Sequence, residues 1–159
     1  MNASAVSTPG GNIAASKPPA RLRSCLYVED SYADLLLVTQ LLARRPDVDL
    51  LTANTGPLGV HMAKELHPDI IFMDINLPGV SGMEVLDRLR DDPATAAIPV
   101  TALSSNAYPS QIEKGMRKGL FRYLTKPFKI DEFMTAIDDM LQQADHTSRE
   151  AGSVAPPGR

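Results

Sequence analysis

Charged and hydroxyl side chains follow the short apolar segments of this sequence at several places. They are Glu29 and Asp30 after segment 25–28, Asp74 after 70–73, Ser104 after 98–103, and Lys126 just beyond 121–124. Taken singly, each has an ordinary explanation as a helix cap, a turn residue or a solvated loop. Taken together, they supply acids, a hydroxyl and an ammonium group to a single site, provided that the segments before them end at one edge of a sheet.

The three acids of this set need positive charge nearby. Carboxylates within about 4 Å of one another repel by roughly 4 kcal/mol per pair at an effective dielectric constant near 20. A cation near Glu29, Asp30 and Asp74 would offset this repulsion. Oxygen ligands beside open solvent favour Mg²⁺, which keeps several of its water ligands and also binds phosphate oxygens. Lys126 supplies a second positive charge. We predict Mg²⁺ as the cofactor.

Asp74 is the candidate nucleophile of this site. A carboxylate beside a metal ion is competent to attack phosphorus and form an aspartyl phosphate, whose equatorial oxygens the metal and Lys126 would stabilise. The hydroxyl of Ser104 would then donate a hydrogen bond to a phosphoryl oxygen. The sequence thus predicts a protein that accepts a phosphoryl group.

The segments between these residues alternate between short apolar runs and longer stretches with helical spacing. The predicted strands are 25–28, 48–52, 70–73, 98–103 and 121–124, and the predicted helices are 32–45, 57–66, 82–91, 110–118 and 131–142. Ser81 and Glu84 have the spacing of a capping box before the third helix. This alternation predicts an α/β fold, a five-stranded parallel sheet with helices on both faces, and such sheets bind ligands at the carboxyl ends of their strands.

Both ends of the sequence differ in composition from the middle. Residues 1–22 and 144–159 are rich in proline, glycine and small polar residues, so we expect flexible tails around a folded domain at 23–143. The first helical turn at Gly56, Pro57 and Gly59 is unusual, and it makes the start of that helix the weakest structural prediction.

Charge and cysteine content exclude several classes of protein. The net charge is −3, and the first 23 residues carry three basic and no acidic side chains, which leaves −6 for the rest. We therefore expect no binding to nucleic acid. The only cysteine, Cys25, begins an apolar run, which predicts a core residue and no disulfide. No run is long enough to span a membrane or to form a signal peptide, so a cytoplasmic location is expected.

The ordered set of motifs resembles the receiver domain of two-component response regulators. The motifs are Glu29-Asp30, Asp74 with Asn76-Leu77-Pro78-Gly79, Ala102-Leu103-Ser104, and Tyr123-Leu124-Thr125-Lys126-Pro127-Phe128. The resemblance covers about residues 23–143. The segment from Phe121 to Pro127 is similar to receivers attached to hybrid sensor kinases.

The resemblance implies a flavodoxin-like strand order 2-1-3-4-5 and a cis peptide bond between Lys126 and Pro127. It implies that a sensor histidine kinase or a histidine phosphotransfer protein phosphorylates Asp74 in trans. It also implies Mg²⁺ bound by Glu29, Asp30, Asp74 and the backbone carbonyl of Asn76. Ser104 and Tyr123 would act as switch residues, and an unknown downstream protein would bind the face formed by the last strand and last two helices.

Other functions fit the sequence less well. A phosphatase of the haloacid dehalogenase type would need an aspartate at Asn76, and a flavin or nucleotide site would need glycines where Glu29, Asp30 and Ser31 stand. A scaffold would have no use for the costly charge cluster. We therefore expect a signalling protein and no turnover enzyme. A role as relay intermediate, phosphate sink or output regulator stays open, as does homodimerisation.

Overall fold

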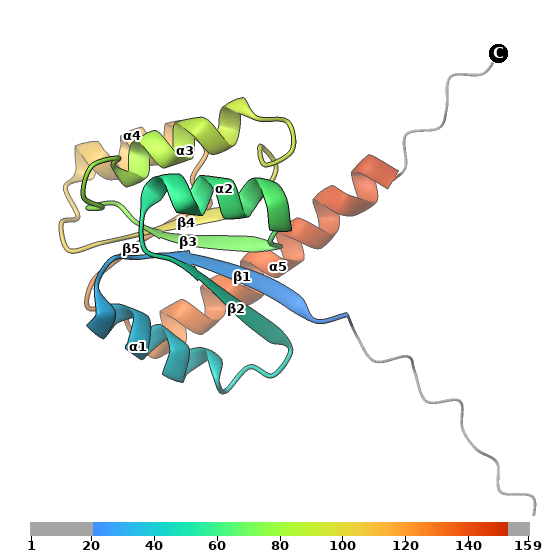
Figure 1. The fold of residues 1–159 in the computed structure, drawn as a ribbon, viewed down its shortest axis with the longest axis horizontal. Coiled ribbons are helices and arrows are strands. Elements are labelled where there is room, and N and C mark those ends of the chain that lie inside the picture. The colour runs from blue at the N-terminus through green and yellow to red at the C-terminus, as the bar shows by residue number, and fades with distance from the viewer. Residues whose placement is uncertain (1–20, 153–159) are drawn as a thin grey trace, which may run out of the picture.

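The computed structural model describes residues 21–152 and contains one five-stranded sheet, seen edge-on in Figure 1. Its strands are β1 (Arg23–Val28), β2 (Val48–Ala53), β3 (Ile70–Asp74), β4 (Val100–Ser104) and β5 (Arg122–Thr125). The strand order is β2-β1-β3-β4-β5, and every neighbouring pair is parallel. The predicted fold class and strand order are therefore confirmed, and the peptide bond between Lys126 and Pro127 is cis.

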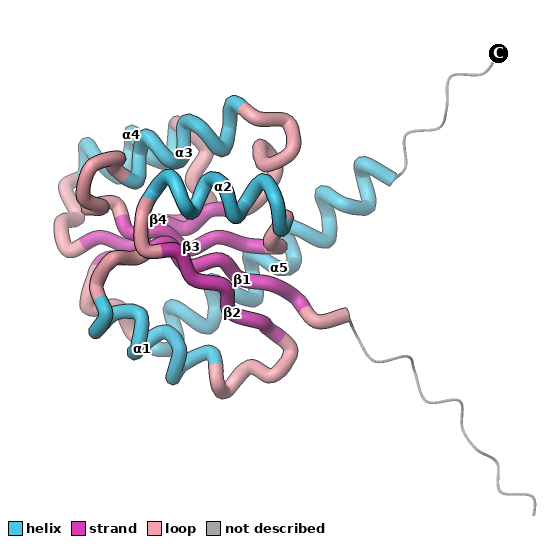
Figure 2. The backbone as a smooth tube through the Cα atoms, viewed as in Figure 1, coloured by secondary structure: helices cyan, strands magenta, loops and turns pink. Residues whose placement is uncertain are grey.

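Five helices cover both faces of this sheet, as Figure 2 shows. They are α1 (Tyr32–Leu42), α2 (Gly56–Leu66), α3 (Gly82–Asp91), α4 (Pro109–Arg117) and α5 (Ile130–Gly152). Helices α1 and α5 lie on one face, and α2, α3 and α4 lie on the other (Figure 1). Parallel strands require such crossover helices, and both faces of the sheet are consequently buried.

Hydroxyl side chains define where three of the helices begin. Ser31, Thr55 and Ser81 each accept a hydrogen bond from the backbone N–H three residues later, at the starts of α1, α2 and α3. Such caps satisfy N–H groups that have no partner inside the helix. The predicted start at Ser81 is confirmed, because its Oγ accepts from the N–H of Glu84 at 3.3 Å.

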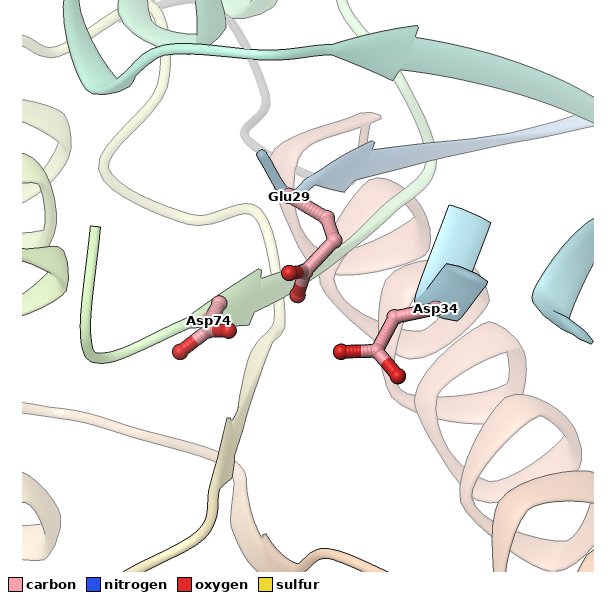
Figure 3. A group of neighbouring side chains, drawn as sticks. All are labelled: Glu29, Asp34 and Asp74. Atoms are coloured by element: carbon pink, nitrogen blue, oxygen red, sulfur yellow. The ribbon is translucent and has the colours of Figure 1, made fainter. Parts of the chain in front are cut away.

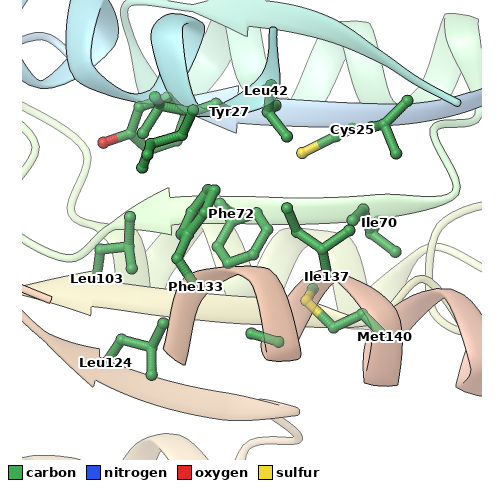
Figure 4. Packing of buried hydrophobic residues seen from close by; sticks show 14 of the residues in the cluster. Cys25, Tyr27, Leu42, Ile70, Phe72, Leu103, Leu124, Phe133, Ile137 and Met140 are labelled. Atoms are coloured by element: carbon green, nitrogen blue, oxygen red, sulfur yellow. The ribbon is translucent and has the colours of Figure 1, made fainter. Parts of the chain in front are cut away.

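The first core lies between the sheet and helices α1 and α5. Figure 4 shows its centre, where the ring of Phe133 on α5 packs 4.6 Å from that of Phe72 on β3. Cys25 is buried there, as predicted. Helix α1 contributes Val38, Leu41 and Leu42 to this core, whereas its Leu36 is 46% exposed.

Gly59 explains why the start of α2 is atypical in sequence. A Cβ atom at this position would lie 2.7 Å from a methyl group of Val28, so the helix approaches β1 closely only because residue 59 has no side chain. Gly56 is similarly close to Val85 on α3. The helix begins one residue before the predicted Pro57, with Thr55 as its cap.

Helix α5 continues ten residues beyond the predicted end at Gln142, so residues 144–152 are helical where we predicted a flexible tail. The segment 143–151 contains Ala, Gln, Arg and Glu and neither glycine nor proline, which favours helix. Asp145 also forms an ion pair with Arg23 at 2.7 Å. Although α5 has 23 residues, no helix in the described segment 21–152 is long and apolar enough to cross a membrane.

The N-terminal tail was predicted for residues 1–22, and its residues 1–20 lie outside the described part of the chain. Arg21 and Arg23 form ion pairs with Asp69, which precedes β3, at 2.7 and 3.4 Å. The basic residues at this edge of the sheet thus connect β1 with the segment that precedes β3.

Candidate functional site

Three carboxylates gather at the carboxyl edge of the sheet. Glu29 follows β1, Asp74 ends β3, and Asp34 lies in the first turn of α1. Figure 3 shows the three side chains projecting into one small space, and one oxygen of each lies within 4.8 Å of the others. Chain segments that are 45 residues apart in sequence therefore build one acidic group, because parallel strands end at the same edge.

Lys126 lies just beyond β5 and donates to all three acids. Its Nζ is 2.8 Å from Asp74 Oδ2, 2.9 Å from Asp34 Oδ2 and 3.0 Å from Glu29 Oε2. An ammonium group has three N–H donors, so each donor has one carboxylate partner. The arrangement explains how the carboxylates tolerate one another's proximity.

Glu29 is fully buried, and two further donors hold its carboxyl group. The hydroxyl of Tyr27, which is itself fully buried, donates to Oε2 at 3.1 Å. The backbone N–H of Ser31 donates to Oε1 at 3.0 Å. Buried polar groups are costly without partners, and these bonds fix the orientation of Glu29 toward the other acids.

Asp74 is 6% exposed, and both of its oxygens accept hydrogen bonds. The backbone N–H of Asn76 donates to Oδ1 at 2.7 Å, and Lys126 donates to Oδ2. Burial alone would raise the pKa of Asp74, but the neighbouring Glu29 carboxyl group, the Lys126 ammonium and the Asn76 N–H outweigh burial and hold this pKa below its usual range. At neutral pH, Asp74 is therefore an ionised carboxylate.

The pKa of Glu29 is shifted in the opposite direction. Burial foremost, and then the neighbouring Asp74 carboxyl group, raise the pKa of Glu29 to about 7. Burial also disfavours the charged form of Lys126, but its hydrogen bonds to the three carboxylates outweigh this effect and raise its pKa. The ammonium is therefore charged, and Glu29 binds a proton more readily than Asp74 does.

Asp30 is the predicted metal ligand that the structure does not bring into the acidic group. Its side chain is exposed, and the group instead contains Asp34, which the sequence reasoning missed. The predicted site residues follow strands, whereas Asp34 lies within a helix. The signal that would have identified it is the serine cap at Ser31, because a first-turn acid three residues after a cap lies near the strand ends.

The predicted switch residues Ser104 and Tyr123 share a partner in the loop after β4. Ser104 Oγ donates to the backbone carbonyl of Asn106 at 3.0 Å and accepts from its N–H at 3.1 Å. The hydroxyl of Tyr123 donates to the same carbonyl oxygen, also at 3.0 Å. The two hydroxyl groups are thus coupled through one peptide unit.

A pocket of about 310 Å³ opens beside the acidic group. Its lining residues are Asp34, Leu37, Ser105, Lys126, Pro127 and Phe128. The pocket contains both partners of the Asp34–Lys126 ion pair and lies between α1 and the loop after β5. A small anion or the side chain of another protein would approach the carboxylates past these residues.

Gly82 positions Asp74, because the start of α3 lies against the end of β3. A Cβ atom at residue 82 would be 2.5 Å from the carbonyl oxygen of Asp74 and 2.7 Å from the Cα atom of Ile75. We expect Gly82→Ala to lower the free energy of unfolding by about 1–3 kcal/mol, because the backbone must shift to admit the methyl group. Urea denaturation measures this change.

The matched control for this substitution is Gly152→Ala. A Cβ atom at residue 152 would meet no atom within 4 Å, so we expect that variant to unfold like the wild type. Equal stability of Gly82→Ala and the wild type would show that α3 can move away from β3 without cost.

Comparison with known proteins gives a consistent result. A family model described as the response regulator receiver domain matches residues 25–138. The chain is similar to the polar-differentiation response regulator DivK of Brucella ovis, with 33% identity over 122 residues that cover 77% of this chain and 98% of that protein. The DivK protein of Brucella anthropi is 34% identical with the same coverage.

Solved structures are similar over the same region. The signal receiver domain of a Luxo repressor protein from Vibrio parahaemolyticus has a TM-score of 0.74 and 25% identity, covering 79% of this chain and 95% of that one. The receiver domain of a sensor histidine kinase from Pseudomonas aeruginosa has a TM-score of 0.69 and 26% identity, covering 76% and 98%. A magnesium ion is coordinated in the active site cleft of that kinase receiver.

Proposed function

Because the chain belongs to the response regulator receiver family of two-component systems, we propose that Asp74 accepts a phosphoryl group from a phosphohistidine in a Mg²⁺-dependent reaction. The donor is a sensor histidine kinase or a histidine phosphotransfer protein. The observation that carries the proposal is the contact of the Lys126 ammonium with the ionised Asp74 carboxylate at 2.8 Å, inside a group of three acids.

The donor atoms of this group fit Mg²⁺. Glu29 and Asp74 offer carboxylate oxygens to the ion, and hard oxygen ligands are the ones that Mg²⁺ prefers. The proposed ligands are Glu29, Asp30, Asp74 and the backbone carbonyl of Asn76, with Asp30 assigned by family resemblance. When bound, Mg²⁺ supplies positive charge next to the transferred phosphoryl group.

The chain's own residues perform the remaining tasks. An oxygen of the Asp74 carboxylate attacks phosphorus, the new O–P bond forms, and the P–N bond to the imidazole of the donor breaks. The Asn76 N–H and the Lys126 ammonium orient the attacking carboxylate. Lys126 then offers its charge to the phosphoryl oxygens, where negative charge accumulates.

Phosphorylation would change the loop after β4. The added group carries a charge of about −1.5 to −2 and strong acceptor oxygens. Ser104 would leave the carbonyl of Asn106 and donate to the phosphoryl group, and Tyr123, which shares that carbonyl, would lose its fixed arrangement. A downstream protein would bind the altered face of α4, β5 and α5. We propose a cytoplasmic signalling role without turnover of an external substrate.

The test is phosphoryl uptake from a small donor. We expect incubation with acetyl phosphate and Mg²⁺ to add the mass of one phosphoryl group to the intact protein, and incubation with a chelator to add none. Hydroxylamine, which cleaves acyl phosphates, should remove the group, and peptide mapping should place it on Asp74. No uptake with Mg²⁺, or a modification on another residue, would contradict the proposal.

A further inference from the structure

Asp34 is the member of the acidic group to which the proposed function assigns no role. Its Oδ2 lies 2.9 Å from Lys126 Nζ, as close as the carboxylates of Glu29 and Asp74. Since all three N–H donors of the ammonium are used, a phosphoryl oxygen on Asp74 can bind Lys126 only if the ammonium leaves one partner or shares a donor.

Exposure to solvent distinguishes the three partners of Lys126. The side chains of Glu29 and Asp74 are 1% and 9% exposed, whereas that of Asp34 is 37% exposed. A carboxylate that loses its partner must be hydrated instead, and only Asp34 has ready access to water. Breaking the Asp34 contact therefore costs less than breaking either of the other two.

Asp34 has little freedom to follow Lys126 if the ammonium moves. Its backbone is held at the start of α1, because its own N–H donates to Ser31 Oγ at 3.4 Å and the N–H of Leu35 donates to Ser31 O at 3.0 Å. A short side chain on a capped helical turn has little reach. A small displacement of the ammonium toward Asp74 would thus separate the pair.

We infer that Asp34 is a positioning residue, which holds the Lys126 ammonium in the unphosphorylated protein and releases it when Asp74 carries a phosphoryl group. The inference rests on the proposed function. Asp34 competes with the phosphoryl oxygens for one N–H of Lys126, and its negative charge repels an incoming phosphoryl dianion. Both effects slow phosphoryl uptake, so Asp34 limits the rate at which the protein is modified.

The test is the initial rate of uptake from acetyl phosphate at saturating Mg²⁺. Asp34→Asn keeps the shape and an acceptor oxygen but removes the charge. We expect uptake to be roughly tenfold faster, the factor that corresponds to about 1.4 kcal/mol. The acceleration should shrink as ionic strength rises, because salt screens both charge effects. Asp34→Glu, which retains the charge, should remain close to the wild-type rate.

The matched control is Asp138→Asn, which removes the carboxylate that pairs with Arg45 at 2.8 Å. Asp138 lies at the other edge of the sheet, where it lines a pocket together with Arg23 and Asp69. We expect its uptake rate to equal that of the wild type. A second readout is the ¹⁵N signal of the Lys126 ammonium in the unphosphorylated protein, which should shift in Asp34→Asn and not in Asp138→Asn. A simple loss of stability would not produce this pattern.

The outcomes separate this inference from the proposed function. If the wild type takes up no phosphoryl group, the proposed function fails and the inference fails with it. If the wild type is modified and Asp34→Asn is modified equally fast or more slowly, only the inference is overturned. An unchanged ammonium signal in Asp34→Asn would likewise show that Asp34 does not hold Lys126.

Discussion

Replacing Asp74 with asparagine is expected to reduce phosphoryl uptake by more than about 10³-fold, to the background level of the assay. The amide is neutral and a poor nucleophile toward phosphorus, whereas the wild-type pKa, held below its usual range, keeps Asp74 ionised. The measurement is intact mass after incubation with acetyl phosphate and Mg²⁺.

The Asp74→Asn variant should nevertheless fold. Its amide oxygen can still accept from Asn76 or Lys126, and the substitution removes one negative charge from a crowded group of acids. We therefore expect a melting temperature equal to or above that of the wild type. Asp138→Asn, the same change at the opposite edge of the sheet, should retain full uptake. A phosphorylated Asp74→Asn protein would mean that another residue is the acceptor.

The sheet and most of the site could be predicted because they depend on local signals. The segment 70–73 is apolar without interruption, and all of it is buried in β3, so the position of Asp74 at the strand end follows from the sequence. The apolar segments of β5 and β1 likewise predict the positions of Lys126 and Glu29 beyond those strands. Parallel strands then bring these residues together without any information about individual contacts.

The contacts of helical side chains could not be predicted, because the rotation of a helix about its axis decides what each residue contacts. Residues 35–38 are four consecutive apolar residues, so periodicity does not define which face of α1 is buried. Packing against the sheet buries Val38 and leaves Leu36 exposed. The same rotation turns Asp34 toward Lys126. Asp30, in the loop before the helix, is exposed, and its role as a metal ligand stays a prediction.

The end of α5 was misjudged for a different reason. The glycines and prolines that suggested a tail begin only at Gly152, and composition averaged over the last residues concealed the helix-forming segment before them. That segment is held by the ion pair of Asp145 with Arg23, 122 positions away, which no local signal predicts. Contacts between distant residues thus add to helix propensity in determining where such helices end.

Replacing Lys126 with methionine is the second change with a large expected effect. Methionine has a similar length but no charge, so the variant leaves Glu29 and Asp74, both buried, without their ammonium partner. Removing one partner of a buried ion pair typically costs about 3–5 kcal/mol. We expect a loss of about 3 kcal/mol in the free energy of unfolding in metal-free buffer. This value is at the low end of that range because Glu29 can bind a proton and thereby lose its charge.

Urea denaturation followed by circular dichroism measures this loss, and two further variants identify its cause. Lys118→Met removes an ammonium that pairs with Asp87 at the surface, where both side chains are more exposed, so its effect should stay below about 1 kcal/mol. The double variant Lys126→Met with Asp74→Asn should recover part of the lost stability, because it removes one of the unpaired acids.

Magnesium provides the decisive comparison for Lys126. A ligand that binds only the folded protein stabilises it in proportion to the logarithm of its concentration above the dissociation constant. If divalent charge and the ammonium compensate the same carboxylates, Mg²⁺ should stabilise Lys126→Met and leave Asp74→Asn less affected. Even with Mg²⁺, phosphoryl uptake by Lys126→Met should be about 10²-fold slower than uptake by the wild type, because no ammonium group then stabilises the negative charge on the phosphoryl oxygens. Wild-type stability of Lys126→Met in metal-free buffer would show that these acids need no fixed cation.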